Sequence, residues 1–133
     1  MDIFIDTSGF LAVLNRDEER HQEAVTGWRK ILAGEEQLVT SNYVLVETCA
    51  LLQNRMGLAA MRIFQQDVVP VLRLSWVDAA LHKAAVNELL AAGRKKLSLV
   101  DCASFAIMRK LAITTAFTLD KHFREQGFEC YPT

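Results

Sequence analysis

The chain has 133 residues, of which 51% are hydrophobic, and its formal net charge is −1. This length and apolar content suit one hydrophobic core. We therefore expect a single domain over residues 1–133 that does not depend on a disulfide bond or a structural zinc ion for stability. The near-neutral charge does not by itself indicate a nucleic-acid binder, and no apolar run approaches the ~20 residues of a transmembrane helix.

The cysteines and the N-terminus indicate a cytoplasmic protein. Cys49, Cys102 and Cys130 form no CxxC pair, and two of them lie in apolar runs, which is typical of reduced, buried thiols. The first residues contain no basic region, and Asp6 interrupts the apolar run after three residues. We therefore expect no signal peptide.

Short β-like runs alternate with longer helical patterns. The first half predicts a strand, two helices, a strand and two helices, over residues 3–5, 8–14, 18–32, 37–40, 42–55 and 58–66. The second half predicts a strand, two helices, a strand, a short helix and a strand, over residues 68–74, 75–93, 98–111, 113–118, 120–127 and 129–131. Capping boxes, each pairing a serine with an aspartate three residues later, predict the helix starts at Ser75 and Ser98. The alternation favours a parallel sheet covered on both faces.

Four carboxylates occupy otherwise apolar segments: Asp6, Glu47, Asp101 and Asp120. An ionised carboxylate among apolar residues is costly unless it is paired or bound to a cation, and none of these segments contains a lysine or arginine. A divalent hard cation would offset both the burial and the mutual repulsion. Carboxylate and water ligands are typical of Mg²⁺ or Mn²⁺ sites, whereas no Cys/His set has zinc-ligand spacing.

The predicted fold makes convergence of these acids plausible. Asp6 and Asp120 follow strands at the carboxyl edge of the sheet, where ligand sites form, and Asp101 lies in the first turn of its helix. Glu47 lies about one and a half turns into its helix and has no capping role there. Local alternatives exist for the aspartates: Asp101 as the capping partner of Ser98, Asp120 as a helix cap, and Asp6 in the following turn. One shared pocket accounts for all four positions and is our prediction.

The chain resembles the PIN domain, and in particular the free-standing VapC-type toxins of bacterial toxin–antitoxin pairs. The resemblance covers essentially the whole chain and rests on four motifs in order: Ile5-Asp6-Thr7-Ser8, Val46-Glu47, Ser98-Leu99-Val100-Asp101 and Thr118-Leu119-Asp120-Lys121-His122-Phe123. It implies a three-layer α/β/α sandwich with a central parallel sheet. It also implies Mg²⁺- or Mn²⁺-dependent RNA cleavage, a cognate antitoxin protein whose tail enters the acidic groove, and a homodimer.

By position, the resemblance implies that the catalytic, metal-binding acids are Asp6, Glu47, Asp101 and Asp120. The hydroxyls of Ser8 and Thr118 would orient these ligands or a metal-bound water. As a mechanism we expect metal-assisted hydrolysis, with one ion held mainly by Asp6 and Asp101 and the same ion or a second one near Glu47 and Asp120.

Basic residues near these motifs are candidates for contacts with the RNA backbone. They are Arg94, Lys95, Lys96, Lys121 and Arg124. No histidine is required as a base, and none is expected to be well placed. His21 and His82 occupy ordinary positions on amphipathic helices, and His122 is near the site in sequence but is not expected to contact the substrate. Met56, Met61 and Phe64 are candidates for a partner or dimer surface, with burial in the core as the alternative.

Two other functions are compatible with parts of the pattern. A phosphatase of the haloacid dehalogenase type also begins with a strand that ends in aspartate, but it needs a second carboxylate two residues later, where this chain has Ser8. A non-catalytic RNA- or protein-binding module on a PIN fold is the remaining alternative. The presence of all four acids favours the nuclease.

Overall fold

The computed structural model describes residues 1–133 and contains one five-stranded sheet in which every strand pair is parallel. The strands are β1 (Asp2–Ile5), β2 (Gln37–Ser41), β3 (Arg73–Ser75), β4 (Thr115–Phe117) and β5 (Glu129–Tyr131). Their spatial order is β3-β2-β1-β4-β5. The chain therefore winds outward from β1 to β3 and then returns past β1 to β4. The switch in direction lies between β1 and β4, the place where parallel α/β sheets form ligand sites.

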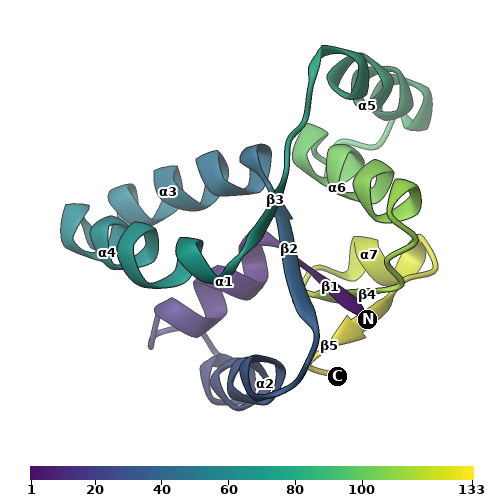
Figure 1. Ribbon diagram of the computed structural model, residues 1–133. Helices are drawn as coiled ribbons and strands as arrows, with labels where there is room; N and C mark the ends of the chain where they lie inside the picture. Colours follow the sequence, from purple (N-terminus) through teal and green to yellow (C-terminus); the bar gives the residue numbers. More distant parts are fainter.

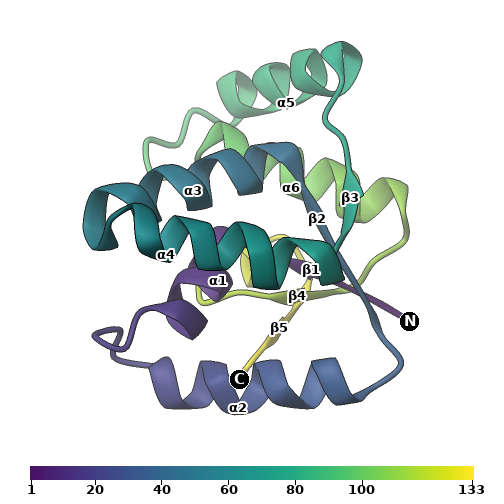
Figure 2. The ribbon, with the colours of Figure 1, turned by 60° about the vertical axis from the view of Figure 1, so that its left-hand side comes forward.

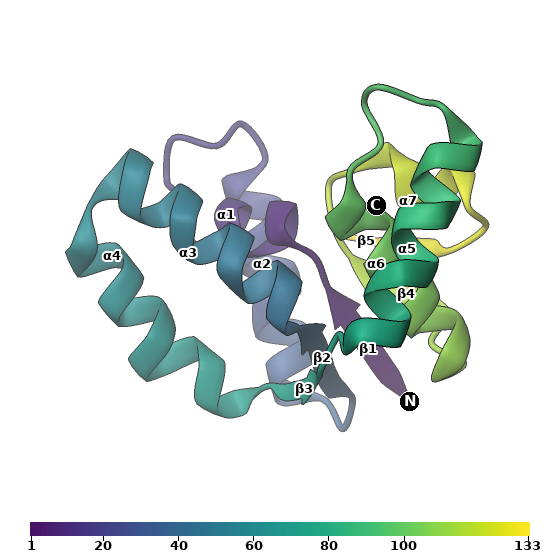
Figure 3. The ribbon, with the colours of Figure 1, turned by 90° about the horizontal axis from the view of Figure 1, so that it is seen from above.

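Helices cover both faces of this sheet (Figures 1 and 3). The helices are α1 (Thr7–Leu14), α2 (His21–Ala33), α3 (Asn42–Met56), α4 (Leu58–Ile63), α5 (Ala79–Ala92), α6 (Leu99–Lys110) and α7 (Lys121–Glu125). Helices α1 to α4 lie on one side of the strands and α5 to α7 on the other, as right-handed crossovers in opposite directions require. The predicted three-layer α/β/α sandwich with a central parallel sheet is confirmed.

The core fills both interfaces between the sheet and its helices. On the α1–α4 side, Phe10 contacts Phe64 and Trp28 edge to face, with ring centroids 5.0 and 6.1 Å apart. On the other side, Phe105 packs against Phe123 of α7 at 4.9 Å. The aromatic contacts on the two faces hold the ends of the strands, and thus the residues that follow them, in one position. Figure 2 shows α2 along the bottom of the molecule and α5 at the top.

Most predicted elements are present, and two predictions are wrong. The β-branched run 68–74 is not one strand: α4 continues into a π-helical turn at Phe64–Val68 and a 3-10 turn at Val69–Val71. Pro70 sits at the start of this second turn, where its fixed φ angle and missing N–H are tolerated. Only Arg73–Ser75 forms strand β3, paired with β2.

The predicted capping box at Ser75 is also wrong. Ser75 ends β3, where it pairs with Ser41, and α5 begins four residues later, at Ala79. The N-cap is Asp78, whose Oδ1 accepts the N–H of Leu81 at 2.9 Å. Between them, Asn42 Oδ1 accepts the N–H of Val77 at 2.6 Å and ties this segment to the start of α3.

The candidate dimer surface is only partly available. Phe64 is fully buried in the core, so it cannot contact a partner, whereas Met56 is 41% exposed. The predicted buried thiols are also only partly correct, because Cys102 is buried while Cys49 and Cys130 are half-buried; all three are free. No helix has the length and apolar character needed to cross a membrane.

Candidate active site

One pocket at the carboxyl edge of the sheet contains all four predicted acids. Asp6 directly follows β1, Asp120 lies three residues after the end of β4, and Asp101 lies in the first turn of α6. Glu47 reaches the same pocket from α3. The pocket is lined by Asp6, Thr7, Ser8, Leu11, Glu47, Leu51, Lys96, Ser98, Asp101 and Asp120. The predicted convergence is thus a property of the fold, whereas catalysis by these residues stays a prediction.

Asp6 is held by two hydroxyl groups. Its Oδ2 accepts hydrogen bonds from Ser8 Oγ at 2.9 Å and from Thr118 Oγ1 at 3.0 Å. The same two hydroxyls accept backbone N–H groups in turn, Ser8 from Leu119 at 2.9 Å and Thr118 from Asp120 at 3.0 Å. This network fastens the start of α1 to the segment after β4. Ser8 and Thr118 therefore contact the carboxylate as the resemblance implies.

Gly9 allows this close approach of α1 to β4. A side chain at position 9 would place its Cβ only 2.5 Å from the carbonyl oxygen of Phe117, a backbone atom that cannot move aside easily. The Asp6 N–H donates to the same carbonyl at 3.1 Å. The absence of a Cβ at this position therefore lets the first turn of α1 rest against the end of β4.

Burial raises the pKa of Asp6 from its ordinary value of 3.8 to about 7. Desolvation is the largest cause, and the nearby negative charge of Asp101 adds to it, while hydrogen bonds from Ser8 and Thr118 oppose the shift. The pKa of Asp101 is also raised, again mainly by desolvation. A pocket that disfavours its own carboxylate charges in this way favours binding of a cation.

The local roles of Asp101 and Asp120 coexist with their place in the pocket. The predicted capping box at Ser98 is confirmed: Asp101 Oδ2 accepts the Ser98 N–H at 3.2 Å, and Ser98 Oγ accepts the Asp101 N–H at 3.0 Å. Asp120 caps α7, because its Oδ1 accepts the His122 N–H at 2.9 Å. Capping and pocket formation are therefore not exclusive alternatives.

Each of the three aspartates uses one oxygen for these local bonds and leaves the other without a hydrogen bond from the protein. The bonded atoms are Oδ2 of Asp6, Oδ2 of Asp101 and Oδ1 of Asp120. The carboxylates are therefore oriented by the protein and still have a free oxygen each. Oriented carboxylates with free oxygens are the donor set that hard divalent cations such as Mg²⁺ and Mn²⁺ prefer, so the residues fit such an ion.

Glu47 approaches from the opposite side of the pocket. Helix α3 is capped by Ser41, whose Oγ accepts the Val44 N–H at 3.2 Å. Thr48, the next residue after Glu47, contacts Thr7 of α1 through their hydroxyls at 3.4 Å. This contact fixes the helical turn that carries Glu47 beside the turn that follows Asp6.

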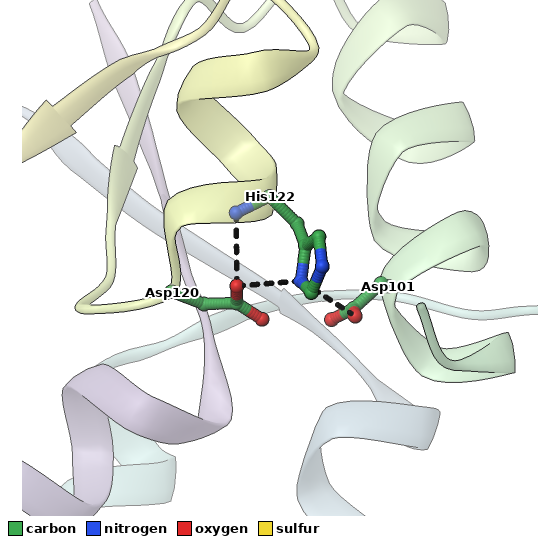
Figure 4. A group of neighbouring side chains, drawn as sticks. All are labelled: Asp101, Asp120 and His122. Carbon is green, nitrogen blue, oxygen red and sulfur yellow. Dashed lines mark hydrogen bonds and ion pairs between the residues drawn. The ribbon is translucent and has the colours of Figure 1, made fainter. Parts of the chain in front are cut away.

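The most compact group of ligand-type side chains includes a residue that the sequence analysis set aside. Asp101, Asp120 and His122 each offer one atom within 4.8 Å of the others, whereas Asp6 and Glu47 line the same pocket outside this group. Figure 4 shows the imidazole of His122 between the two aspartates. Its Nδ1 lies 2.8 Å from Asp120 Oδ1 and 3.9 Å from Asp101 Oδ2. The expectation that no histidine is well placed is therefore wrong for His122.

A local signal for His122 is present in the sequence. An aspartate that caps a helix accepts the N–H of the second or third residue after it, so the side chains at these positions start close together. Phe123, the next residue, is fully buried against Phe105, which turns α7 toward α6. Only this tertiary packing brings His122 to Asp101.

The predicted basic residues do not all lie at the pocket. Lys96 lines it directly. Lys121 and Arg124 line an adjoining depression that also includes Asp120 and Arg20, a residue that the sequence analysis did not select. Arg94 instead pairs with Glu125 at 3.0 Å, and Lys95 is exposed beside neither depression.

The family model described as the PIN domain matches residues 3–129, and the chain therefore belongs to the PIN domain family. It is 36% identical to the 23S rRNA-specific endonuclease VapC20 of Mycobacterium tuberculosis over 127 residues, which is 95% of both chains. A crystal structure of that VapC20, titled a sarcin–ricin loop cleaving toxin, matches with a TM-score of 0.82 over 95% of both chains. The predicted resemblance to PIN domains of the VapC type is confirmed.

Two more distant solved structures share the fold. FitAcB from Neisseria gonorrhoeae matches with a TM-score of 0.69 at 16% identity, over 98% of this chain and 96% of that one. VapBC2 from Rickettsia felis, bound to a DNA fragment from their promoter, matches with a TM-score of 0.65 at 14% identity, over 98% and 97% of the two chains. At these identities the match concerns the fold alone.

Proposed function

We propose that the protein is a metal-dependent endoribonuclease that hydrolyses RNA phosphodiester bonds, and that it is the toxin of a toxin–antitoxin pair. The observation that carries the proposal is the pocket at the switch point of the sheet, where Asp6, Glu47, Asp101 and Asp120 meet. Similarity to VapC20 over nearly the whole chain supports the same activity class.

The aspartates would hold a Mg²⁺ or Mn²⁺ ion through their free oxygens. When bound, such an ion supplies Lewis-acid activation of water and stabilises the negative charge that develops on the phosphate. Ser8 and Thr118 keep Asp6 in one orientation, so the ligand set needs little rearrangement on binding. Glu47 faces these residues from α3 and completes the acidic lining.

RNA would approach across the basic residues beside the pocket. Lys96 lies at the pocket itself, and Lys121 and Arg124 flank Asp120 in the next depression. These side chains would contact backbone phosphates and thus position a phosphodiester over the acids, whose own charge repels it. Arg94 contributes less to this rim because Glu125 neutralises it.

The substrate that we propose is ribosomal RNA. VapC20, which is 36% identical, is named a 23S rRNA-specific endonuclease, and its structure is titled a sarcin–ricin loop cleaving toxin. A cytoplasmic location follows from this substrate. The proposed partners are a cognate antitoxin protein, whose tail would cover the acidic pocket, and a second copy of the chain in a homodimer.

Cleavage of intact ribosomes and of total cellular RNA by the purified protein tests this function. We expect discrete cuts in 23S rRNA with Mg²⁺ or Mn²⁺, none with EDTA, and none with Asp6→Asn. Glu23→Gln is the control, because Glu23 lies on α2 in an exposed pair with Arg20. Cleavage by Asp6→Asn would contradict the proposal. RNA binding without cleavage in any metal would instead support a non-catalytic binding module.

A further inference from the structure

His122 is locked beside the acidic pocket. Its side chain is 9% exposed, and it belongs to the short helix α7, which is anchored by the fully buried Phe123. The contact between Phe123 and Phe105 holds the helix that carries the imidazole against α6. Figure 4 shows the ring directed between Asp120 and Asp101.

Both ring nitrogens of His122 are buried, and neither has a hydrogen-bond partner. Asp120 Oδ1 is close to Nδ1, at 2.8 Å, but it lies outside the direction that a hydrogen bond requires. A buried polar group without a partner is destabilising, and in folded proteins such groups are rare and point to a missing ligand or a functional role. The packing of His122 therefore requires an explanation beyond stability.

We propose that His122 supplies a nitrogen ligand to a mixed metal site, together with one carboxylate oxygen each from Asp101 and Asp120. The proposal rests on the metal dependence in the proposed function and adds the residue that decides which metal is preferred. The three ligand-type atoms lie within 4.8 Å of one another. Ligands about 2.1 Å from an octahedral ion are about 3 Å apart when adjacent and about 4.2 Å apart when opposite. His122 Nδ1 lies 2.8 Å from Asp120 Oδ1 and 3.9 Å from Asp101 Oδ2, the two oxygens that cap helices. The free oxygen of each carboxylate is bonded to the same carbon, so both carboxylates lie within reach of an ion bound to His122.

The consequence is a preference for Mn²⁺ over Mg²⁺. Carboxylate, carbonyl and water ligands suit both Mg²⁺ and Mn²⁺, but Mn²⁺ is a transition metal and accepts an imidazole nitrogen more readily than Mg²⁺ does. A site made only of the four acids would discriminate little between these ions through its ligand type. With His122 as a ligand, Mn²⁺ gains a nitrogen bond that Mg²⁺ does not favour.

The alternative is that His122 only holds Asp120 in place. Such an indirect role also affects metal affinity, since partners of metal ligands contribute about 10- to 100-fold. Loss of affinity alone therefore cannot separate the two roles. A direct nitrogen–metal bond can be detected by magnetic coupling of ¹⁴N to bound Mn²⁺, and a positioning role would not produce it.

The test is Mn²⁺ binding to tag-free protein, measured by electron paramagnetic resonance with ¹⁴N coupling, and competition by Mg²⁺. The chain has three histidines, so the double variant His21→Asn/His82→Asn leaves His122 as the sole imidazole. We expect ¹⁴N coupling in the wild type and in this double variant, and none in His122→Asn. In His122→Asn, the Kd for Mn²⁺ should rise at least about tenfold, while that for Mg²⁺ should change less than about threefold.

Three results would overturn the inference. Stoichiometric Mn²⁺ binding without ¹⁴N coupling in the double variant would remove His122 from the ligand set while leaving the proposed function intact. Equal weakening of Mn²⁺ and Mg²⁺ in His122→Asn would assign His122 a positioning role only. No binding of Mn²⁺ to the wild type at millimolar concentration would contradict both this inference and the metal dependence on which it rests.

Discussion

The hydroxyl of Thr118 donates a hydrogen bond of 3.0 Å to Oδ2 of Asp6, although the two residues are 112 positions apart in the sequence. The same hydroxyl accepts the N–H of Asp120 at 3.0 Å. One side chain therefore connects the acid after β1 with the acid after β4, across the switch point of the sheet. The stability of the fold and the geometry of the pocket depend on the same atoms.

Replacing Thr118 with valine should destabilise the protein. The change keeps the shape but leaves the buried Asp6 carboxylate and the Asp120 N–H each without one partner, which costs about 1–3 kcal/mol. Urea unfolding in EDTA measures this loss. Thr115→Val is the matched control in β4, because Thr115 loses only a long, exposed bond of 3.4 Å to Glu129. We expect its effect to stay within about 0.5 kcal/mol, and equal effects of the two variants would contradict the role of Thr118.

The metal-free protein should lose stability as the pH rises. The pKa of Asp6 is about 7 in the folded protein and 3.8 when unperturbed. The folded state therefore binds more protons between these values, so its stability falls through that window by up to about 4 kcal/mol and levels off above pH 7. The raised pKa of Asp101 acts in the same direction. Urea unfolding at pH 5 and pH 8 in EDTA measures the slope.

Asp6→Asn should flatten this pH dependence and make the metal-free protein more stable than the wild type at pH 8. The amide keeps the shape of the carboxylate but carries no charge and does not titrate. The folded variant therefore no longer binds the extra proton that Asp6 binds in the folded wild type. Added Mn²⁺ should stabilise the wild type more than Asp6→Asn at pH 8. A pH dependence as steep in Asp6→Asn as in the wild type would show that burial of Asp6 is not the cause.

Gly9→Ala should weaken both folding and activity. Its Cβ would lie 2.5 Å from the Phe117 carbonyl oxygen, so α1 must move away from β4 at a cost of about 1–3 kcal/mol, and the Ser8 contacts move with it. Gly27→Ala is a useful comparison, because its Cβ meets the Tyr131 ring at 2.9 Å, a side chain that can shift. Thermal unfolding and rRNA cleavage should both show the larger loss for Gly9→Ala.

Lys96→Ala and Arg124→Ala should each weaken RNA binding without changing the fold. If each side chain neutralises a phosphate, each variant lowers the slope of log affinity against log salt concentration by about one. Lys83→Ala is the control, since Lys83 is exposed on α5 and lines neither depression. Binding of a catalytically inactive Asp6→Asn form to RNA at several salt concentrations measures the slopes. Unchanged slopes in both variants would exclude the basic rim.

Local signals in the sequence predicted much of this protein. Alternation of apolar strands with amphipathic helices indicated the parallel sheet, because the period of apolar residues depends only on neighbouring positions. The capping box at Ser98 and the charged residues inside apolar runs could also be predicted, because these patterns too depend only on neighbouring positions in the sequence. Where two signals competed locally, as at Pro70 and at Ser75 with Asp78, the prediction was wrong. There, pairing with β2 and the contact with Asn42 decided the element boundaries.

The sequence by itself determined the fold class and which four acids would meet. An ionised carboxylate in an apolar run is costly unless it is paired or bound to a cation, so the positions of these acids indicated a shared site. Only the tertiary structure decided the inner arrangement of the pocket. Packing of Phe123 on Phe105 brings His122 to Asp101. The pairing of Arg94 with Glu125, and the position of Arg20 beside Arg124, also arise from segments far apart in the chain. Such contacts depend on side-chain directions across elements, which no local pattern encodes.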